Sequence, residues 1–196
     1  RMWSVSKSTR CWKVTSRNAY ESAEYKVIVT DGAYEIREYP DLMLARTVSQ
    51  IESQGEDGSF MKLFGFISGK NEQEQKIAMT VPVFMEQNSS GNDGSMGFVM
   101  PEIVARDGVP TPISGAVRID ERPGGRFAVI RFEGRLSETV VREKEAVLRQ
   151  WMEGSGLTAD VDAETAGYDP PWTPGPFRRN EVLIRIDETD NTNSLL

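Results

Sequence analysis

The sequence contains no histidine and only one cysteine, Cys11. Without histidine, the chain has no Ser-His-Asp or Cys-His catalytic group, no histidine zinc site and no proximal histidine for haem. A single cysteine permits neither an internal disulfide nor a cysteine-rich metal site, so cysteine usage leaves the localisation undetermined. These absences exclude the commonest catalytic and metal-binding arrangements.

Long apolar runs are also missing, and no stretch approaches the roughly 18 residues of a membrane-spanning helix. Lys and Arg number 23 against 30 Asp and Glu, which gives a formal net charge of −7. Nucleic-acid binding depends on a basic face that neutralises phosphates, so this charge balance predicts no nucleic-acid partner. Because the sequence begins at Arg1, removal of an upstream targeting segment is compatible with it.

The chain divides into three segments by composition. Residues 1–24 have no sustained period and are rich in Ser, Lys and Arg, which is typical of an N-terminal arm or linker. Residues 25–187 carry every predicted strand and helix and form the expected domain. Residues 188–196 are interpreted as an acidic tail. At 196 residues, the chain is long enough for one sizeable core.

The first half of the domain predicts three strands followed by a helix. A β-branched run at residues 25–29 closes with Asp31-Gly32, a hairpin signal. One apolar helical face is expected from the i, i+3, i+4, i+7 spacing of Phe60, Leu63, Phe64 and Ile67. Apolar residues at every second position over 77–85 predict a further strand, with Pro82 at an edge or bulge.

The second half repeats this order. Strands are expected over 117–122 and 126–132, and a helix follows Ser137. Shifting the sequence by 83 residues aligns 36–40 with 119–123. The pattern predicts an α+β domain of about eight strands, a distorted antiparallel β-barrel of two pseudo-symmetric β-β-α repeats with two long helices. Residues 105–115 are predicted as a loop, and 158–167 are interpreted as a long polar run.

Few residues are candidates for chemistry. The eight methionines suit either core packing or a loosely shaped apolar ligand surface. Glu35 or Glu133 beside a tyrosine would form an acid–base pair, and alternation on solvent-facing strands explains the same residues. Arg178-Arg179 after the proline-rich loop would grip a carboxylate or phosphate, or form a solubilising turn.

Five motifs resemble the SOUL/haem-binding protein (HBP) family. In chain order they are YEIREY, FMKLFGFISGKN, KIAMTVPV, MGFVMP and YDPPWTPGPFRRNEV. They span residues 25–187 in the order typical of that family. The resemblance implies a barrel of two βαββ-like repeats, in agreement with the internal repeat.

The same resemblance implies a haem or tetrapyrrole ligand held in a shallow apolar groove with basic residues near its propionates. By matching position, the expected lining is Arg46, Met61, Lys62, Phe64 and Met79. No histidine ligand carries over, so a Tyr phenolate, a Met thioether or Cys11 would meet the iron, or the ring would bind by face contact alone. No metal site independent of the tetrapyrrole is expected.

The sequence therefore predicts a non-enzymatic haem- or tetrapyrrole-binding protein, a carrier or buffer. A small-molecule-binding or hydrolytic domain, like the GyrI-like effector-binding domains that the fold also resembles, is the first alternative. A protein-interaction module with no tetrapyrrole ligand, docked through the Pro-Trp-Pro loop or a methionine-rich surface, is the second. Fold analogy alone does not decide among them.

Overall fold

The computed structural model describes residues 20–49, 58–86, 94–170 and 172–187. Cys11, most of the expected arm and the expected acidic tail lie outside these ranges. The helices are α1 (Ser59–Ile67), α2 (Glu102–Asp107), α3 (Glu138–Gly154) and the 3-10 helix η2 (Gly175–Phe177). The strands are β1 (Glu21–Ser22), β2 (Lys26–Asp31), β3 (Tyr34–Tyr39), β4 (Leu42–Ser49), β5 (Thr80–Val81), β6 (Val83–Glu86), β7 (Gly94–Val99), β8 (Arg118–Arg122), β9 (Gly125–Glu133), β10 (Ala159–Gly167) and β11 (Arg179–Ile186).

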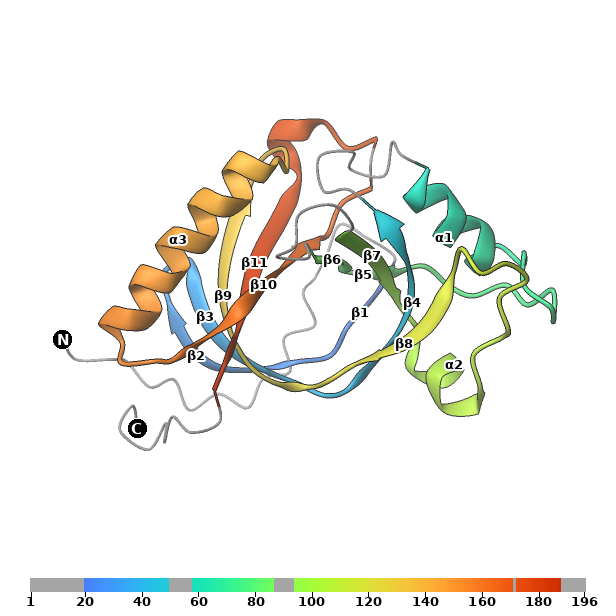
Figure 1. Cartoon of the computed structure of the whole chain (residues 1–196), viewed down its shortest axis with the longest axis horizontal. Helices are drawn as coiled ribbons and strands as arrows, with labels where there is room; N and C mark the ends of the chain where they lie inside the picture. Colours follow the sequence, from blue (N-terminus) through green and yellow to red (C-terminus); the bar gives the residue numbers. More distant parts are fainter. Residues whose placement is uncertain (1–19, 50–57, 87–93, 171, 188–196) are drawn as a thin grey trace.

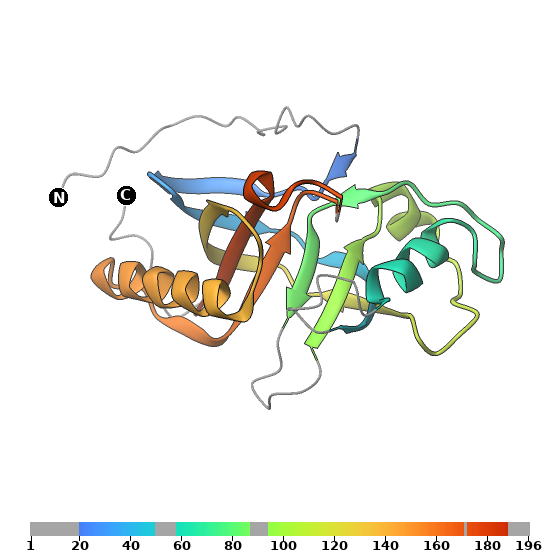
Figure 2. The ribbon, with the colours of Figure 1, turned by 90° about the horizontal axis from the view of Figure 1, so that it is seen from above.

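Nine of these strands form one curved sheet in the order β2-β3-β9-β11-β10-β6-β7-β4-β8, with antiparallel neighbours throughout. Helix α3 lies outside the half made of β2, β3, β9, β11 and β10, and α1 lies outside the other half (Figures 1 and 2). Short strand β1 pairs in parallel with β5. No pair among the described residues joins the end strands β2 and β8, so the sheet is open and the expected closed barrel is not formed.

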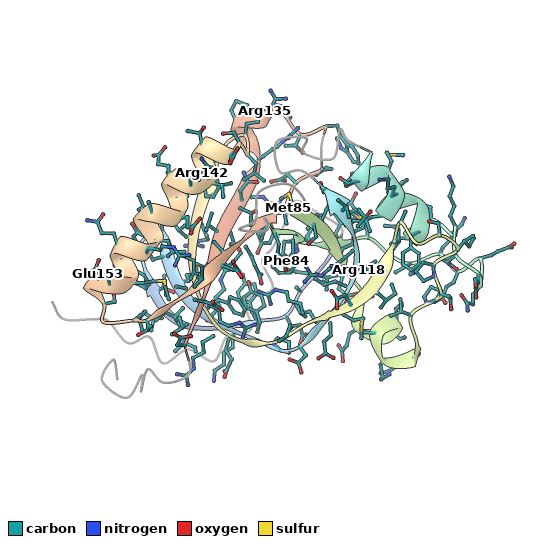
Figure 3. All side chains as sticks on the ribbon, viewed as in Figure 1. Phe84, Met85, Arg118, Arg135, Arg142 and Glu153 are labelled. Carbon is teal, nitrogen blue, oxygen red and sulfur yellow. The ribbon has the colours of Figure 1, made fainter. Side chains whose placement is uncertain are left out.

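The two faces of the sheet bury different side chains. We call the face that packs against α1 and α3 the outer face; Ile36, Ala45 and Phe98 lie in its core. The opposite, inner face buries Leu44 and Phe84, among others. Since side chains alternate along a strand, each strand contributes to both cores. Figure 3 shows Phe84 between the two halves of the sheet.

Several predicted elements are confirmed. Helix α1 is present and buries Phe60, Leu63 and Ile67 as predicted, although Phe66 takes the buried place expected for Phe64. Helix α3 begins after Ser137, whose side-chain oxygen accepts a hydrogen bond from the Val140 amide. Of the two helices expected to be long, α3 has 17 residues and α1 has 9. The hairpin at Asp31 and both strands of the second half are also present.

Other predictions are wrong. Residues 159–167, interpreted from the sequence as part of a polar run and not as a strand, form β10 inside the sheet. Helix α2 lies at the start of the expected loop, and the strand expected over 77–85 is divided at Pro82 into β5 and β6. Proline cannot donate to a strand ladder, which explains the division. The sheet also has more strands than the expected eight.

The register relates the two halves of the sequence. Strands β3 and β4 are not paired with each other; β3 pairs with β9 and β4 with β8. The pair Tyr39↔Gly125 becomes Leu42↔Arg122 when each residue is moved by the same 83-residue offset that separates Asp41 from Gly124. The Gly124 amide donates to the Asp41 carboxylate at 2.7 Å, where the β3–β4 and β8–β9 connections cross.

Candidate functional site

Helix α1 presents three of the five expected ligand-lining residues to solvent. Its buried side is formed by Phe60, Leu63, Phe66 and Ile67, together with Ser59. Met61 is 62% exposed and Phe64 41% exposed, and Lys62 lies between them in sequence and is also exposed. The exposed face of α1 is therefore apolar with one flanking cation.

Arg46 lies on the other side of β4. The outer face of β4 contacts α1 through Ser49, whose hydroxyl lies 3.0 Å from the Ser59 hydroxyl. Arg46 is three positions from Ser49 and so points to the inner face. There it is buried and forms an ion pair with Glu86 at 2.6 Å. Met79, the fifth residue, is half-buried and packs against the outer core. The structure thus leaves only Met61, Lys62 and Phe64 of the five exposed on α1, with Met61 and Phe64 about one turn apart and Lys62 on the other side of Met61.

Sequence reasoning missed a buried ionic cluster on the inner face. Arg37 is 1% exposed and donates from Nη1 and Nη2 to the Glu181 carboxylate at 2.8 and 2.7 Å. Its Nε donates to Glu35 at 2.6 Å. The Tyr168 hydroxyl donates to Glu181 at 2.7 Å, and the Tyr25 ring lies 4.2 Å from the Arg37 guanidinium. The pattern Glu35, Arg37, Tyr39 at every second position was the available signal, but it is equally typical of a solvent-facing strand.

The cluster shifts the pKa values of its arginine and its tyrosines. Burial raises the pKa of Tyr39, and burial together with the Glu181 charge raises the pKa of Tyr168 well above its usual value. Burial alone would lower the pKa of Arg37, but the charge and hydrogen bonds of Glu181 outweigh it and raise that pKa. Arg37 is therefore a permanent cation enclosed by carboxylates and neutral phenols.

A second buried arginine, Arg122, lies on the inner face. Arg122 pairs with Glu164 at 2.7 Å, and its guanidinium lies 4.3–5.1 Å from the ring centroids of Phe127, Phe84 and Tyr39. Such contacts between a cation and aromatic faces stabilise a desolvated charge. Charged groups and aromatic rings thus fill the middle of the inner face.

Of the candidate acid–base and anion-binding residues, Glu35 and Arg179 are held in ion pairs and Glu133 is exposed. Glu35 accepts from Arg37 and also forms an ion pair with Arg131 at 3.2 Å. Glu133 is exposed, at a position on β9 opposite Arg179. Arg179 itself is clamped by the two carboxylate oxygens of Asp169, both at 3.0 Å. That clamp holds the proline-rich loop.

No group of three or more His, Cys, Asp and Glu side chains within the described ranges could hold a metal ion. In the same part of the chain, no helix is both long and apolar enough to span a membrane. Two large aromatic side chains of the proline-rich loop, Trp172 and Phe177, are mostly exposed.

The molecule is thus a small α+β domain with an open antiparallel sheet, helices on the outer face and buried ion pairs on the inner face. The family described as SOUL heme-binding protein matches residues 20–185, nearly all of this sheet. Heme-binding protein 2 of Homo sapiens is 32% identical over 173 residues, covering 83% of this chain and 82% of that protein. The same values hold for heme-binding protein 2 of Mus musculus. The chain belongs to the SOUL heme-binding protein family.

Solved structures of other proteins share the fold. The EcmrR C-terminal domain aligns with a TM-score of 0.58 and 12% identity, over 83% of this chain and 98% of that domain. A hydrolase from Listeria innocua aligns with a TM-score of 0.53 and 12% identity, over 79% of this chain and 91% of that one. At such low identity these similarities show the fold alone.

Proposed function

We propose that this chain is a non-enzymatic haem- or tetrapyrrole-binding protein, a carrier or buffer, and that the exposed face of α1 forms the main contact with the ring. The observation that carries the proposal is the exposure of Met61 and Phe64 beside Lys62 on one helix, in a family described as heme-binding. Large apolar side chains exposed together are typical of ligand or partner surfaces.

The residues on α1 fit the chemistry of a tetrapyrrole, which is a flat apolar ring with carboxylate substituents. Phe64 and the flexible, polarisable Met61 provide apolar contact area, and Lys62 offsets one carboxylate charge. When haem is bound, its iron supplies a centre that accepts axial ligands. With no histidine in the sequence, affinity rests mainly on apolar burial and charge pairing. Met79 supports the site from the outer core, whereas Arg46, buried on the inner face and paired with Glu86, lies outside the proposed contact.

Two features support a binding role without turnover. The inner-face carboxylates Glu35, Glu164 and Glu181 are each paired with an arginine, so none is a free general acid or base. The tyrosines next to Glu181 have raised pKa values, which opposes their use as bases near neutral pH. The exposed loop around Trp172 remains the candidate surface for a protein partner.

An absorbance titration tests the proposal. We expect hemin and iron-free protoporphyrin IX to bind the full chain saturably at a 1:1 ratio. Replacing both Met61 and Phe64 with Ala should weaken both ligands by about tenfold or more, which corresponds to about 1.4 kcal/mol. The matched control is Val161→Ala, since Val161 is 80% exposed and lies on β10 beside α3, in the half of the sheet that α1 does not cover.

Cys11→Ala separates the proposed site from ligation by the thiol. Retention of the hemin shift in this variant supports binding at the folded domain. Loss of the shift would assign binding to Cys11, and no saturable shift with either ligand would refute the tetrapyrrole proposal. Equal weakening by Val161→Ala would refute the assignment to α1.

We also infer that the two halves of the domain are copies of one β-β-α unit. The common 83-residue offset in sequence and in the pairs β3–β9 and β4–β8 supports this inference.

A further inference from the structure

Two arginines lie directly opposite each other on neighbouring strands. In the register of β4 and β8, Arg46 is paired with Arg118. Both side chains are on the inner face of the sheet. Figure 3 shows Arg118 on β8, the end strand of this half. Like charges at directly opposite positions destabilise a strand pair. An anionic group between them would remove this repulsion.

Asp120 partly supplies that group. One carboxylate oxygen, Oδ2, lies 3.6 Å from Arg46 Nε and 3.8 Å from Arg118 Nη2. Both distances exceed those of a hydrogen bond. Asp120 therefore sits between the two guanidinium groups as an ion-pair partner without hydrogen-bonding to either.

One hydrogen-bond donor of the Arg46 guanidinium has no acceptor among the described residues. Its Nη1 forms an ion pair with Glu86 and donates to the Ser95 hydroxyl at 3.2 Å. Its Nε is buried and has no hydrogen-bond partner among the residues that the structure describes. An unpaired buried donor is unfavourable, so a group that accepts from it is expected.

The position is built for Arg46 and open to solvent. Gly97 on β7 faces Arg46, and a Cβ there would lie 3.3 Å from Arg46 Cγ, so glycine leaves room for the arginine side chain. The side chains of Arg118 and Asp120 are 68% and 45% exposed. Arg46 and Arg118 are balanced by Glu86 and Asp120, so an incoming anion must replace the Asp120 carboxylate rather than add to it.

We propose that the position between Arg46 and Arg118 binds the carboxylate of a small organic acid, in exchange with the side chain of Asp120. A carboxylate is the group that the position already accommodates, and planar carboxylates match the donor geometry of guanidinium. The site lies on the inner face, opposite α1, and does not depend on tetrapyrrole binding.

The test is an NMR titration of the full chain with acetate, observed at the Nε–H signal of Arg46. Wild type should show a saturable shift. Asp120→Asn removes the competing carboxylate and should bind acetate about tenfold more tightly, whereas Arg118→Gln should bind it about tenfold more weakly. Both replaced residues are substantially exposed, which favours retention of the fold. Arg106→Gln, in an exposed ion pair with Asp107 on α2, is the matched control and should leave the titration unchanged.

A parallel titration with inorganic phosphate defines the ligand class. Tighter binding of phosphate than of acetate would overturn the carboxylate assignment. Absence of a saturable shift, or equal acetate affinity in wild type, Asp120→Asn and Arg118→Gln, would overturn the site itself. None of these outcomes depends on hemin binding, so failure here and failure of the tetrapyrrole proposal are distinguishable.

Discussion

Glu181 accepts more hydrogen bonds from buried side chains than its neighbours in the ionic cluster: two from Arg37 and one from Tyr168. Glu181→Gln should therefore leave the Arg37 charge buried and only partly compensated. We expect the free energy of unfolding to fall by about 3–5 kcal/mol, measured by urea denaturation. Glu38→Gln is the control, because Glu38 forms only an exposed ion pair with Lys26, and should change it by less than about 1 kcal/mol. A similar effect of both substitutions would contradict a stabilising role for the cluster.

The buried phenols predict a loss of stability in alkali. Their pKa values are raised by burial above the ordinary 10.0 in the folded state, for both Tyr39 and Tyr168. Below pH about 10 the phenols are neutral in both states and have no effect. As pH rises above about 10, the unfolded chain loses these protons first, so stability should fall by about 1.4 kcal/mol per pH unit for each phenol.

Urea denaturation at a series of alkaline pH values measures this slope. The variant Tyr39→Phe/Tyr168→Phe removes both phenols and should show a shallower decline, whatever its stability at neutral pH. An unchanged slope in that variant would assign the alkaline loss to other groups.

At the residue scale, only part of the candidate site was predictable. The spacing assigned Phe64 to the apolar face of the helix, whereas the structure buries Phe66 there and leaves Phe64 exposed beside Met61. The direction of Arg46 was not predictable, since both faces of β4 are buried and alternation alone does not say which face meets α1. The Arg37 cluster was missed because charged residues on a strand ordinarily indicate solvent.

Among the elements, the crossing of the β3–β4 and β8–β9 connections tolerates no side chain at Gly124. A Cβ there would lie 2.5 Å from the carbonyl oxygen of Tyr39 and 2.8 Å from the amide nitrogen of Asp41. Because both of these atoms belong to the backbone, Gly124→Ala must displace one of the two crossing connections. We expect a loss of at least about 1–3 kcal/mol in the free energy of unfolding, or failure to fold.

Gly115→Ala is the control for this substitution, because a Cβ at Gly115 meets no atom within 4 Å. Thermal melts of both variants compare the two positions. A melting temperature for Gly124→Ala equal to that of wild type would show that the crossing is looser than described.

Elements with a clear period were predictable and those with mixed polarity were not. Helices α1 and α3 follow from apolar spacing and, for α3, from the Ser137 cap. Strand β10 was missed because Asp160, Asp162 and Glu164 alternate where core residues were expected. Glu164 is half-buried through its pairing with Arg122, a partner on β8 that no local pattern reveals.

At the scale of the whole molecule, the sheet is held together by pairs between distant segments. Strand β3 pairs with β9 and β4 with β8, while β6, β7, β10 and β11 complete the order between them. Closing such long loops costs conformational entropy before the pairs compensate for it. Local sequence patterns identified most of the strands, though not β10, but could not establish that the sheet stays open, because closure depends on whether the end strands β2 and β8 meet.

The same topology has a consequence for synthesis on the ribosome. Strand β3 emerges long before β9, its partner on the side away from β2, and most of the protein must be translated before that edge is covered. An apolar strand whose edge stays unpaired for this time would promote aggregation. We expect the charges of Glu35 and Arg37 to keep the nascent segment hydrated until β9 has been made. The charges whose burial is costly in the finished protein thus protect the chain while it is being made.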